Sequence, residues 1–318
     1  MEIGYHASHE QFPPSRLAAA ARAAEAAGFA AVLSSDHFAP WSTAQDESGY
    51  AWTWLGAAMG ATSVPFGIVT APGVRYHPAV TAQAVATVGE LFPGRFTPAL
   101  GSGQALNEHI TGAPWPSKPE RNARLTECAG LIRRLLDGET VDHEGRVSVR
   151  AARLYTRPAA PPPLFAAALS PQTAREVAAW ADGLITVNAP HERLRAITEA
   201  FREGGGEGRP LHLQVHLSWH PDEDRARAQA LEQWRFAALP RETNQELGLP
   251  EQFDAACADL APDALDDAVH ITADLDRHAA LLAGYGDLGF TRLYLHQVGA
   301  DQERFIDRFG ERVLPQLM

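Results

Sequence analysis

The stretch EIGYHASHEQFPPSRLAAAARAAEAAGFAAVLSS, residues 2–35, begins and ends with short apolar runs and carries a helical pattern between them. Residues 2–7 and 30–35 are typical of buried strands, and residues 15–27 are typical of a helix that Gly28 ends. Two apolar strands separated by an amphipathic helix predict a βαβ unit, whose strands run parallel in a sheet that is covered on both faces.

The same alternation continues along the chain. Eight such units predict a closed (β/α)8 TIM barrel rather than the two domains that a length of 318 residues would suggest at about 150 residues per domain. We expect one domain over residues 1–318, with a hairpin excursion at 140–155 and a mostly helical insertion at about 221–262, between strands seven and eight. The remaining strands are expected at 65–71, 96–101, 163–168, 183–187, 211–217 and 292–297, and most of the helices at about 52–62, 78–91, 119–137, 171–181, 190–203 and 300–317.

The composition excludes several classes of protein. The net charge of −12 opposes binding to phosphate backbones and to anionic lipid surfaces, so we expect neither nucleic acid nor membrane as a partner. No stretch reaches the roughly 18 apolar residues of a membrane span, and the N-terminus lacks the pattern of a signal peptide. The two cysteines form neither a disulfide framework nor a metal-binding spacing. We therefore expect a cytoplasmic protein.

In a barrel of this kind the active site lies at the carboxyl ends of the strands. The predicted strand ends carry aromatic, hydroxyl and amide groups and few charged clusters, which suits a flat, mostly apolar ring that is hydrogen-bonded at its edge. A metal would need converging carboxylates or imidazoles. His212, His216 and His220 fall at even spacing on one face of a predicted strand, but no carboxylate lies between them at ligand spacing, so a partly solvated strand face is the simpler interpretation.

Three features at these ends each allow two interpretations. Asp36 could fix the tautomer of a proton-transferring His37, or the two could be a capping residue and an incidental histidine. Trp41 could stack on a substrate or pack under a loop. Ser170, followed by proline, could cap a helix only, or the helix start could also bind a phosphate.

Six motifs in this chain occur in the same order in a known family. They are Tyr5-x-Ala7-Ser8-x-Glu10-Gln11-Phe12, Ser35-Asp36-His37-Phe38-x-Pro40-Trp41, Arg75-Tyr76-x-Pro78-Ala79-Val80, Gly101-Ser102-Gly103-x-Ala105-Leu106-Asn107-Glu108, Asp182-Gly183 and Asp301-Gln302-x-x-Phe305. With these motifs the whole chain resembles the bacterial luciferase-like superfamily of flavin and deazaflavin oxidoreductases, and within it the deazaflavin-dependent glucose-6-phosphate dehydrogenase group. The resemblance implies a TIM barrel that is usually a dimer.

The resemblance also implies roles for individual residues. It places His37 near the hydride-transferring centre and a non-prolyl cis peptide bond between Ile68 and Val69, behind the cofactor ring. The catalytic candidates are His37, Trp41, Gln104 and Glu108. The candidates for cofactor binding are Asp36, His37, Ile68, Val69, Ala71, Ser102 and Asn107, with Ala167, Ala168, Leu169 and Ser170 at the cofactor phosphate.

Departures from the group's pattern alter the expected substrate. Gln104 stands where the dehydrogenases carry an acid, so acid catalysis must come from His37, Glu108 or solvent. The group's sugar-phosphate cations are missing, since its threonine and lysine align with Val187 and Pro190 and its other lysine falls near Asp267. We therefore do not expect glucose 6-phosphate as substrate, and we expect the cofactor phosphate to depend mainly on backbone N–H groups.

The sequences of residues 7–12 and of Trp52-x-Trp54-Leu55-Gly56 resemble those of a branch of the group that is thought to have reverted from the deazaflavin to FMN. We therefore favour FMN over coenzyme F420. The expected activity is hydride transfer to a small organic substrate or its monooxygenation, with a flavin reductase as a candidate electron donor and a homodimer as the assembly. Two alternatives stay open: a metal-dependent barrel hydrolase that uses His6, His212 and His216, and a non-catalytic flavin-binding protein.

Overall fold

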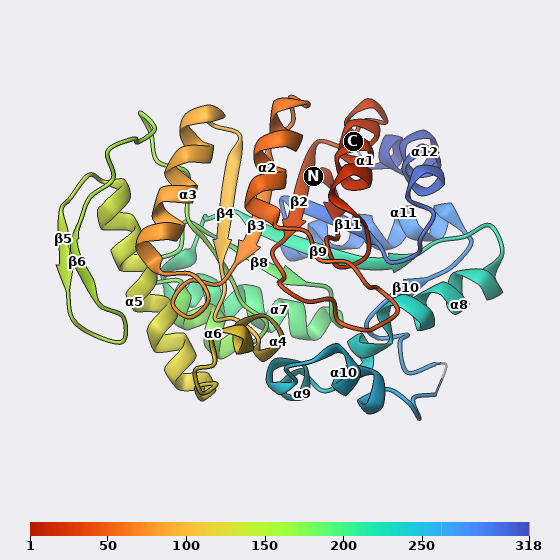
Figure 1. The fold of residues 1–318 in the computed structure, drawn as a ribbon. Coiled ribbons are helices and arrows are strands. Elements are labelled where there is room, and N and C mark those ends of the chain that lie inside the picture. Colours follow the sequence, from red (N-terminus) through yellow and green to blue (C-terminus); the bar gives the residue numbers. More distant parts are fainter. Residues whose placement is uncertain (262, 318) are drawn as a thin grey trace.

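The computed structural model describes residues 1–261 and 263–317 and contains a closed barrel of eight parallel strands (Figure 1). Neighbouring strands follow the chain order, and pairings of β11 with β1 and of β8 with β9 complete the closure. The eight strands are those that the sequence predicts, and they confirm the TIM barrel. They are β1 (Glu2–Ala7), β2 (Ala31–Ser35), β3 (Phe66–Thr70), β4 (Phe96–Leu100), β7 (Phe165–Ala167), β8 (Gly183–Val187), β9 (Leu211–Ser218) and β11 (Arg292–Gln297).

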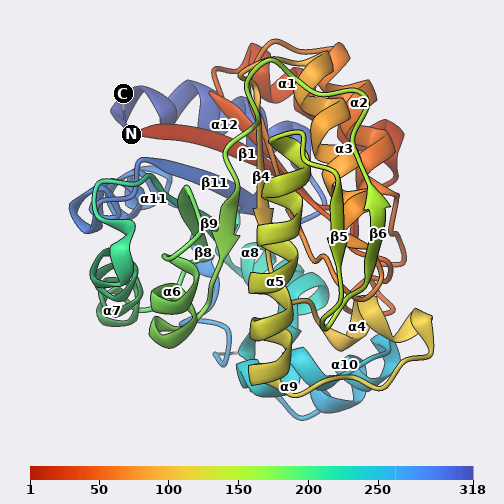
Figure 2. The same cartoon turned by 90° about the vertical axis from the view of Figure 1, so that its left-hand side faces the viewer.

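Helices surround the barrel and pack against the outer faces of its strands (Figures 1 and 2). Gly28 ends the first of them with a φ of 97°, a left-handed conformation that favours glycine. The helices are α1 (Pro14–Ala26), α2 (Ala51–Gly60), α3 (Pro78–Leu91), α4 (Ala105–Glu108), α5 (Lys118–Leu136), α6 (Pro171–Val177), α7 (His191–Phe201), α11 (Leu275–Gly284) and α12 (Gln302–Arg312), with short 3-10 or π turns at 109–111, 202–206, 286–288 and 314–316.

Both predicted excursions from the barrel are present. An antiparallel pair, β5 (Val141–His143) and β6 (Val149–Ala152), forms the hairpin beside α5 (Figure 2). The insertion contains α8 (Glu223–Trp234), a 3-10 turn at 235–238, α9 (Arg241–Glu246) and α10 (Pro250–Ala256). A two-residue strand, β10 (His270–Ile271), then pairs with β9 before α11. Residues 262 and 318, at the ends of the predicted insertion and domain, lie outside the described residues.

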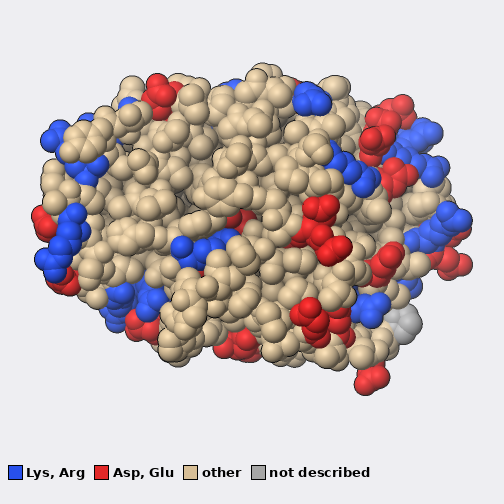
Figure 3. Space-filling model, in the orientation of Figure 1, with Lys and Arg blue, Asp and Glu red and all other residues tan. Residues whose placement is uncertain are grey.

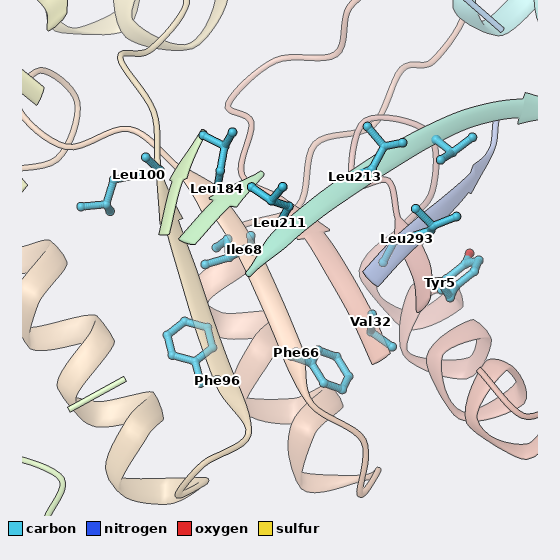
Figure 4. Packing of buried hydrophobic residues seen from close by; sticks show 14 of the residues in the cluster. Tyr5, Val32, Phe66, Ile68, Phe96, Leu100, Leu184, Leu211, Leu213 and Leu293 are labelled. Carbon is cyan, nitrogen blue, oxygen red and sulfur yellow. The ribbon is translucent and has the colours of Figure 1, made fainter. Parts of the chain in front are cut away.

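Strand side chains alternate between two apolar cores. On β3, Phe66 and Ile68 point outward into the large cluster between strands and helices, part of which Figure 4 shows. The next residue, Val69, points the other way and packs against a smaller cluster inside the barrel, which includes Leu33 and Phe165. Because both faces of the barrel sheet are buried, the sequences of its strands are near-continuous apolar runs.

A third apolar cluster fixes the insertion over one end of the barrel. Trp41 and Leu106, in segments that follow β2 and β4, pack with Trp234, Phe236 and Phe253 of the insertion. Figure 1 shows α9 and α10 at the end toward which β3 and β4 point, next to α4. The insertion therefore covers the carboxyl ends of the strands, which we call the barrel mouth.

Acidic and basic side chains are interspersed on the face of the molecule drawn in Figure 3, around a broad area without charged side chains. Over residues 1–261 and 263–317, no helix combines the length and the apolar character that crossing a bilayer requires.

Candidate active site

A buried histidine–carboxylate pair lies at the barrel mouth, where the loops after β1 and β2 meet. Nε2 of His37 lies 3.3 Å from Oε1 of Glu10. The other oxygen, Oε2, accepts hydrogen bonds from the hydroxyls of Ser8 (2.9 Å) and Ser35 (2.7 Å). Burial by itself would raise the pKa of Glu10, but the adjacent His37 and the Ser35 hydrogen bond outweigh it and lower that pKa. Glu10 is therefore an ionised acceptor for a proton on Nε2 of His37.

This pairing leaves the other ring nitrogen of His37 available. Nδ1 is buried and has no hydrogen-bond partner among the described residues. With the proton held on Nε2 by Glu10, Nδ1 is the basic nitrogen of the neutral ring. The pair thus has the arrangement of a general base that a carboxylate orients.

Asp36 does not orient His37, so that interpretation of the Asp36–His37 dipeptide was wrong. Its carboxylate accepts hydrogen bonds from Thr70 Oγ1 (2.6 Å) and from the Tyr76 hydroxyl (3.1 Å), and it lies 3.4 Å from Nη2 of Arg75. Successive side chains of an extended segment point in opposite directions, which sends Asp36 toward β3 and His37 toward the loop after β1.

Arg75 joins Asp36 to the second candidate acid, Glu108. The backbone N–H of Arg75 donates to Oε2 of Glu108 at 2.6 Å, and its Nε lies 3.8 Å from Oε1. Glu108 is almost fully buried, and this burial raises the pKa of its carboxyl. Oε1 has no hydrogen-bond partner among the described residues. The role of Glu108 as an acid stays a prediction.

Trp41 packs under the insertion. Its ring stacks on Phe236, with centroids 4.6 Å apart and planes 11° from parallel, and it meets the edge of Phe253 at 5.4 Å. The other side of Trp41 faces His37, with ring centroids 5.0 Å apart. Trp41 therefore links His37 to the insertion, and its contact with substrate stays a prediction.

The amide and hydroxyl candidates lie together after β4. Asn107 Oδ1 accepts a hydrogen bond from the backbone N–H of Phe38 at 2.8 Å, and its Nδ2 lies 3.4 Å from Oε1 of Gln104. The turn before them reaches a φ of 79° at Gly103, a left-handed conformation that favours glycine. Ser102 accepts a hydrogen bond from Nζ of Lys118 at 2.7 Å.

The predicted phosphate region contains cations that the sequence analysis missed. Ser170 caps α6 as expected, with its Oγ accepting from the backbone N–H of Thr173 at 3.3 Å. The carbonyl of Leu169 accepts hydrogen bonds from the guanidinium groups of Arg193 (3.3 Å) and Arg241.

Lys118 contacts Ser102 after β4, and Arg193 and Arg241 share the carbonyl of Leu169 after β7. No carboxylate of the described residues lies within ion-pair distance of these three cations. Burial, followed by Arg121, lowers the pKa of Lys118 to about 8, and burial, followed by Arg193, lowers the pKa of Arg241 to about 10. An anion could therefore bind to charged side chains here, and not mainly to backbone N–H groups as expected.

The peptide bond between Ile68 and Val69 is trans, so the predicted cis bond was wrong. The structure contains no cis peptide bond in residues 1–261 and 263–317. Ile68 and Val69 pair in register with Ser34 and Ser35 of β2 and also with β4. A trans bond continues this regular ladder, whereas a cis bond costs about 3–4 kcal/mol.

The opposite half of the barrel mouth is suited to a flat ring. Val69 and Ala167 are half-buried and pack with Ala99 inside the barrel. Beside them a Cβ on Gly101 would lie 3.7 Å from that of Ala167. Together with the unpartnered Nδ1 of His37, these small side chains fit a flavin or deazaflavin ring. Of the other cofactor candidates, Ala71 and Leu169 are half-buried and Ala168 is buried.

Of the histidines of the alternative metal site, His212 lies apart from His6 and His216. His212 packs its ring against Phe165 (4.7 Å between centroids) and Tyr294 (5.8 Å), on the inner face of the barrel and four residues before His216 along β9. In the part of the chain that the structure describes, no three His, Cys, Asp or Glu side chains are grouped so that they could hold a metal ion. This arrangement gives the metal-hydrolase alternative no support.

Comparisons with known proteins agree on one family. The model of the luciferase-like monooxygenase family matches residues 1–292. Proteins named F420-dependent glucose-6-phosphate dehydrogenase, from Beutenbergia cavernae and Nakamurella multipartita, are 37% and 38% identical to this chain; the matches cover 100% of this chain and 97% and 96% of theirs.

Solved structures give the same result for the fold. An F420-dependent secondary alcohol dehydrogenase, solved in complex with an F420-acetone adduct, is 29% identical, with a TM-score of 0.93 over 100% of this chain and 99% of that one. A coenzyme F420-dependent tetrahydromethanopterin reductase from Methanopyrus kandleri, at 21% identity and a TM-score of 0.78 over the full length of both chains, shares the fold.

Proposed function

This chain belongs to the luciferase-like monooxygenase family of oxidoreductases, and we propose that it is an F420-dependent enzyme that interconverts an alcohol and a carbonyl compound. The observation that carries the proposal is the His37–Glu10 pair, with its free Nδ1 at the barrel mouth. The likeness to an F420-dependent alcohol dehydrogenase at a TM-score of 0.93 supports it.

The proposed chemistry divides between cofactor and protein. Bound F420 supplies the hydride acceptor for oxidation of the alcohol. Nδ1 of His37 takes the hydroxyl proton, and Glu10 stabilises the imidazolium that results. Gln104 can orient an oxygen by hydrogen bonding but cannot transfer a proton, so His37 must return the proton in the reverse direction.

The named relatives change which cofactor we favour for this chain. FMN was favoured, but the relatives above 25% identity that are described above are named as F420-dependent. Lys118, Arg193 and Arg241 provide positive charge where the cofactor phosphate is predicted, and F420 carries further carboxylates beyond that phosphate. We therefore propose F420, and FMN becomes the alternative to be tested.

The substrate and the partners stay predictions. The relatives from Beutenbergia cavernae and Nakamurella multipartita are named as glucose-6-phosphate dehydrogenases. The resemblance, however, aligns the phosphate-binding lysines of that group with Pro190 and with a position near Asp267 in this chain. We propose a substrate other than glucose 6-phosphate. A homodimer, a single domain over residues 1–318 and a cytoplasmic location remain our expectations, and a flavin reductase would be needed only if FMN were the cofactor.

Titration of the purified protein with F420 and with FMN, each in both redox states, tests the cofactor. Tighter binding of F420, together with reduction of F420 by a secondary alcohol, is the expected result. His37→Ala should slow that reduction about a thousandfold while leaving cofactor affinity within a few-fold, since a general base contributes to rate rather than to binding. His220→Ala is the matched control, because Nδ1 of His220 accepts a hydrogen bond from the backbone N–H of Asp222 at 3.0 Å and is not free to act as a base. Binding of FMN alone, or unchanged turnover in His37→Ala, would overturn the proposal.

A further inference from the structure

Six aromatic and imidazole rings form a continuous wall at the barrel mouth, on the side of β1 and β11 and across from the small side chains of β4 and β7. His6 and His296 come from the strands, Trp234 and Phe236 from the insertion, and Trp41 and His37 from the loop after β2. We call these six the aromatic wall. Successive ring centroids are 4.4 Å (His6–His296), 4.4 Å (His296–Trp234), 4.6 Å (Trp234–Phe236), 4.6 Å (Phe236–Trp41) and 5.0 Å (Trp41–His37) apart.

Burial, together with the hydrogen bonds of His296, keeps the histidine end of the aromatic wall uncharged. Nε2 of Gln11 donates to the carbonyl of Val298 at 2.8 Å, which turns its Oε1 toward Nε2 of His296, also at 2.8 Å. His296 must therefore carry its proton on Nε2, and its Nδ1 faces the amide donor of Gln214 at 3.4 Å. Burial also lowers the pKa of His6 to about 4 and holds that of His296 well below its ordinary value.

Besides Nδ1 of His37, two buried polar atoms of the aromatic wall have no hydrogen-bond partner among the described residues. Nδ1 of His6 and Nε1 of Trp234 form no hydrogen bond with any described residue, although each residue is only 4% exposed. Buried polar groups are nearly always paired, so each of these atoms points to a missing partner. The indole N–H of Trp234 can only donate, so its partner must offer an acceptor such as an oxygen.

Building on the proposed function, we propose that the substrate is an uncharged aromatic alcohol or ketone that carries a second oxygen. Its ring packs against the aromatic wall, its reacting oxygen meets Nδ1 of His37, and its second oxygen accepts the hydrogen bond of Trp234 Nε1. Rings stack on aromatic faces more favourably than short aliphatic chains do. The aromatic wall contains no lysine or arginine, so a phosphate dianion would find no cation there.

Binding of three ketones to the cofactor-free protein, followed by calorimetry, tests the site without turnover. We expect 4-hydroxyacetophenone to bind about tenfold more tightly than acetone. Trp234→Phe should weaken 4-hydroxyacetophenone about fivefold, the worth of one neutral hydrogen bond, and should leave acetophenone unchanged. Trp180→Phe is the matched control, because Trp180 also has an unpartnered indole N–H but packs against the large core outside the barrel.

A second variant covers the case in which Trp234→Phe fails to fold. Phe236→Leu should weaken both aromatic ketones to a similar degree while leaving acetone unchanged, because it removes ring surface and no hydrogen bond. Equal affinity of acetone and 4-hydroxyacetophenone for the unaltered protein would overturn the proposal, as would an equal loss for both aromatic ketones in Trp234→Phe.

Turnover separates this proposal from the proposed function. With F420 bound, 1-(4-hydroxyphenyl)ethanol should have a kcat/KM about tenfold above those of 2-propanol and glucose 6-phosphate. A higher value for 2-propanol or glucose 6-phosphate would refute the substrate class and leave F420-dependent alcohol oxidation intact. If no alcohol reduced F420, the proposed function would be refuted. The ketone-binding experiment would then remain as the test of whether the aromatic wall binds an aromatic compound.

Discussion

Replacing Glu10 with glutamine keeps the size of the side chain and removes the charge beside His37. At the observed 3.3 Å, a carboxylate and an imidazolium attract each other by about 5 kcal/mol at an effective dielectric constant of about 20. His37 is 14% exposed, so water screens part of this attraction, and we expect a loss of about 2–3 kcal/mol. The attraction exists only after His37 has taken the substrate proton. It therefore lowers kcat by roughly 30- to 150-fold and has little effect on KM.

Steady-state rates of F420 reduction, measured across pH with cofactor affinity determined in parallel, check this expectation. Glu127→Gln is the matched control, since Glu127 pairs with His143 at 2.8 Å in the hairpin, outside the mouth. Equal unfolding midpoints for the two variants would show that both are folded. A Glu10→Gln enzyme that binds F420 normally and retains kcat within threefold would refute the assignment of Glu10.

Three further outcomes are expected. Because the pKa of Lys118 is lowered to about 8, its charge is present below that pH and lost above it, so the affinity for F420 should fall about tenfold from pH 7 to 9.5. Direct titrations of the Lys118→Met variant should show no such dependence on pH. Arg75→Met leaves the buried carboxylates of Asp36 and Glu108 without their cation and should lower the free energy of unfolding in urea by about 3 kcal/mol. A second change, Glu108→Gln, should recover part of this stability, and an unchanged urea midpoint in Arg75→Met would contradict the bridging role. Ser170→Asp keeps the helix cap but repels a phosphate, so F420 affinity should fall at least about tenfold while Ser170→Asn stays near the original value; equal affinities would remove the phosphate from this position.

The barrel could be predicted because each of its strands carries a local signal. Residues 66–70 are buried on both faces between β2 and β4, so nearly every side chain there had to be apolar or small. The stop at Gly28 and the cap at Ser170 are also local, because each depends on one residue and its own backbone. Patterns of this kind can be seen without knowledge of distant contacts.

The partners within the site could not be predicted in the same way. Glu10 lies 27 positions from His37, and only the parallel pairing of β1 with β2 brings their following loops together. The neighbour in sequence, Asp36, turns away toward β3. Trp234, far along the chain, reaches the barrel mouth because an apolar cluster fixes the insertion there. Glu10 did belong to a recurring motif, which was the one available signal for its importance.

The insertion has a consequence for how such an enzyme diversifies. Trp234 and Phe236 belong to one contiguous segment, whereas Glu10, His37 and the strand ends belong to the barrel. Because no barrel strand runs through that segment, it can be exchanged between relatives, or redesigned, without altering the closure of the sheet. A relative's insertion that keeps Arg241 would change the rings that face the substrate and leave the His37–Glu10 pair in place, so such a chimaera would be a compact way to transfer substrate preference.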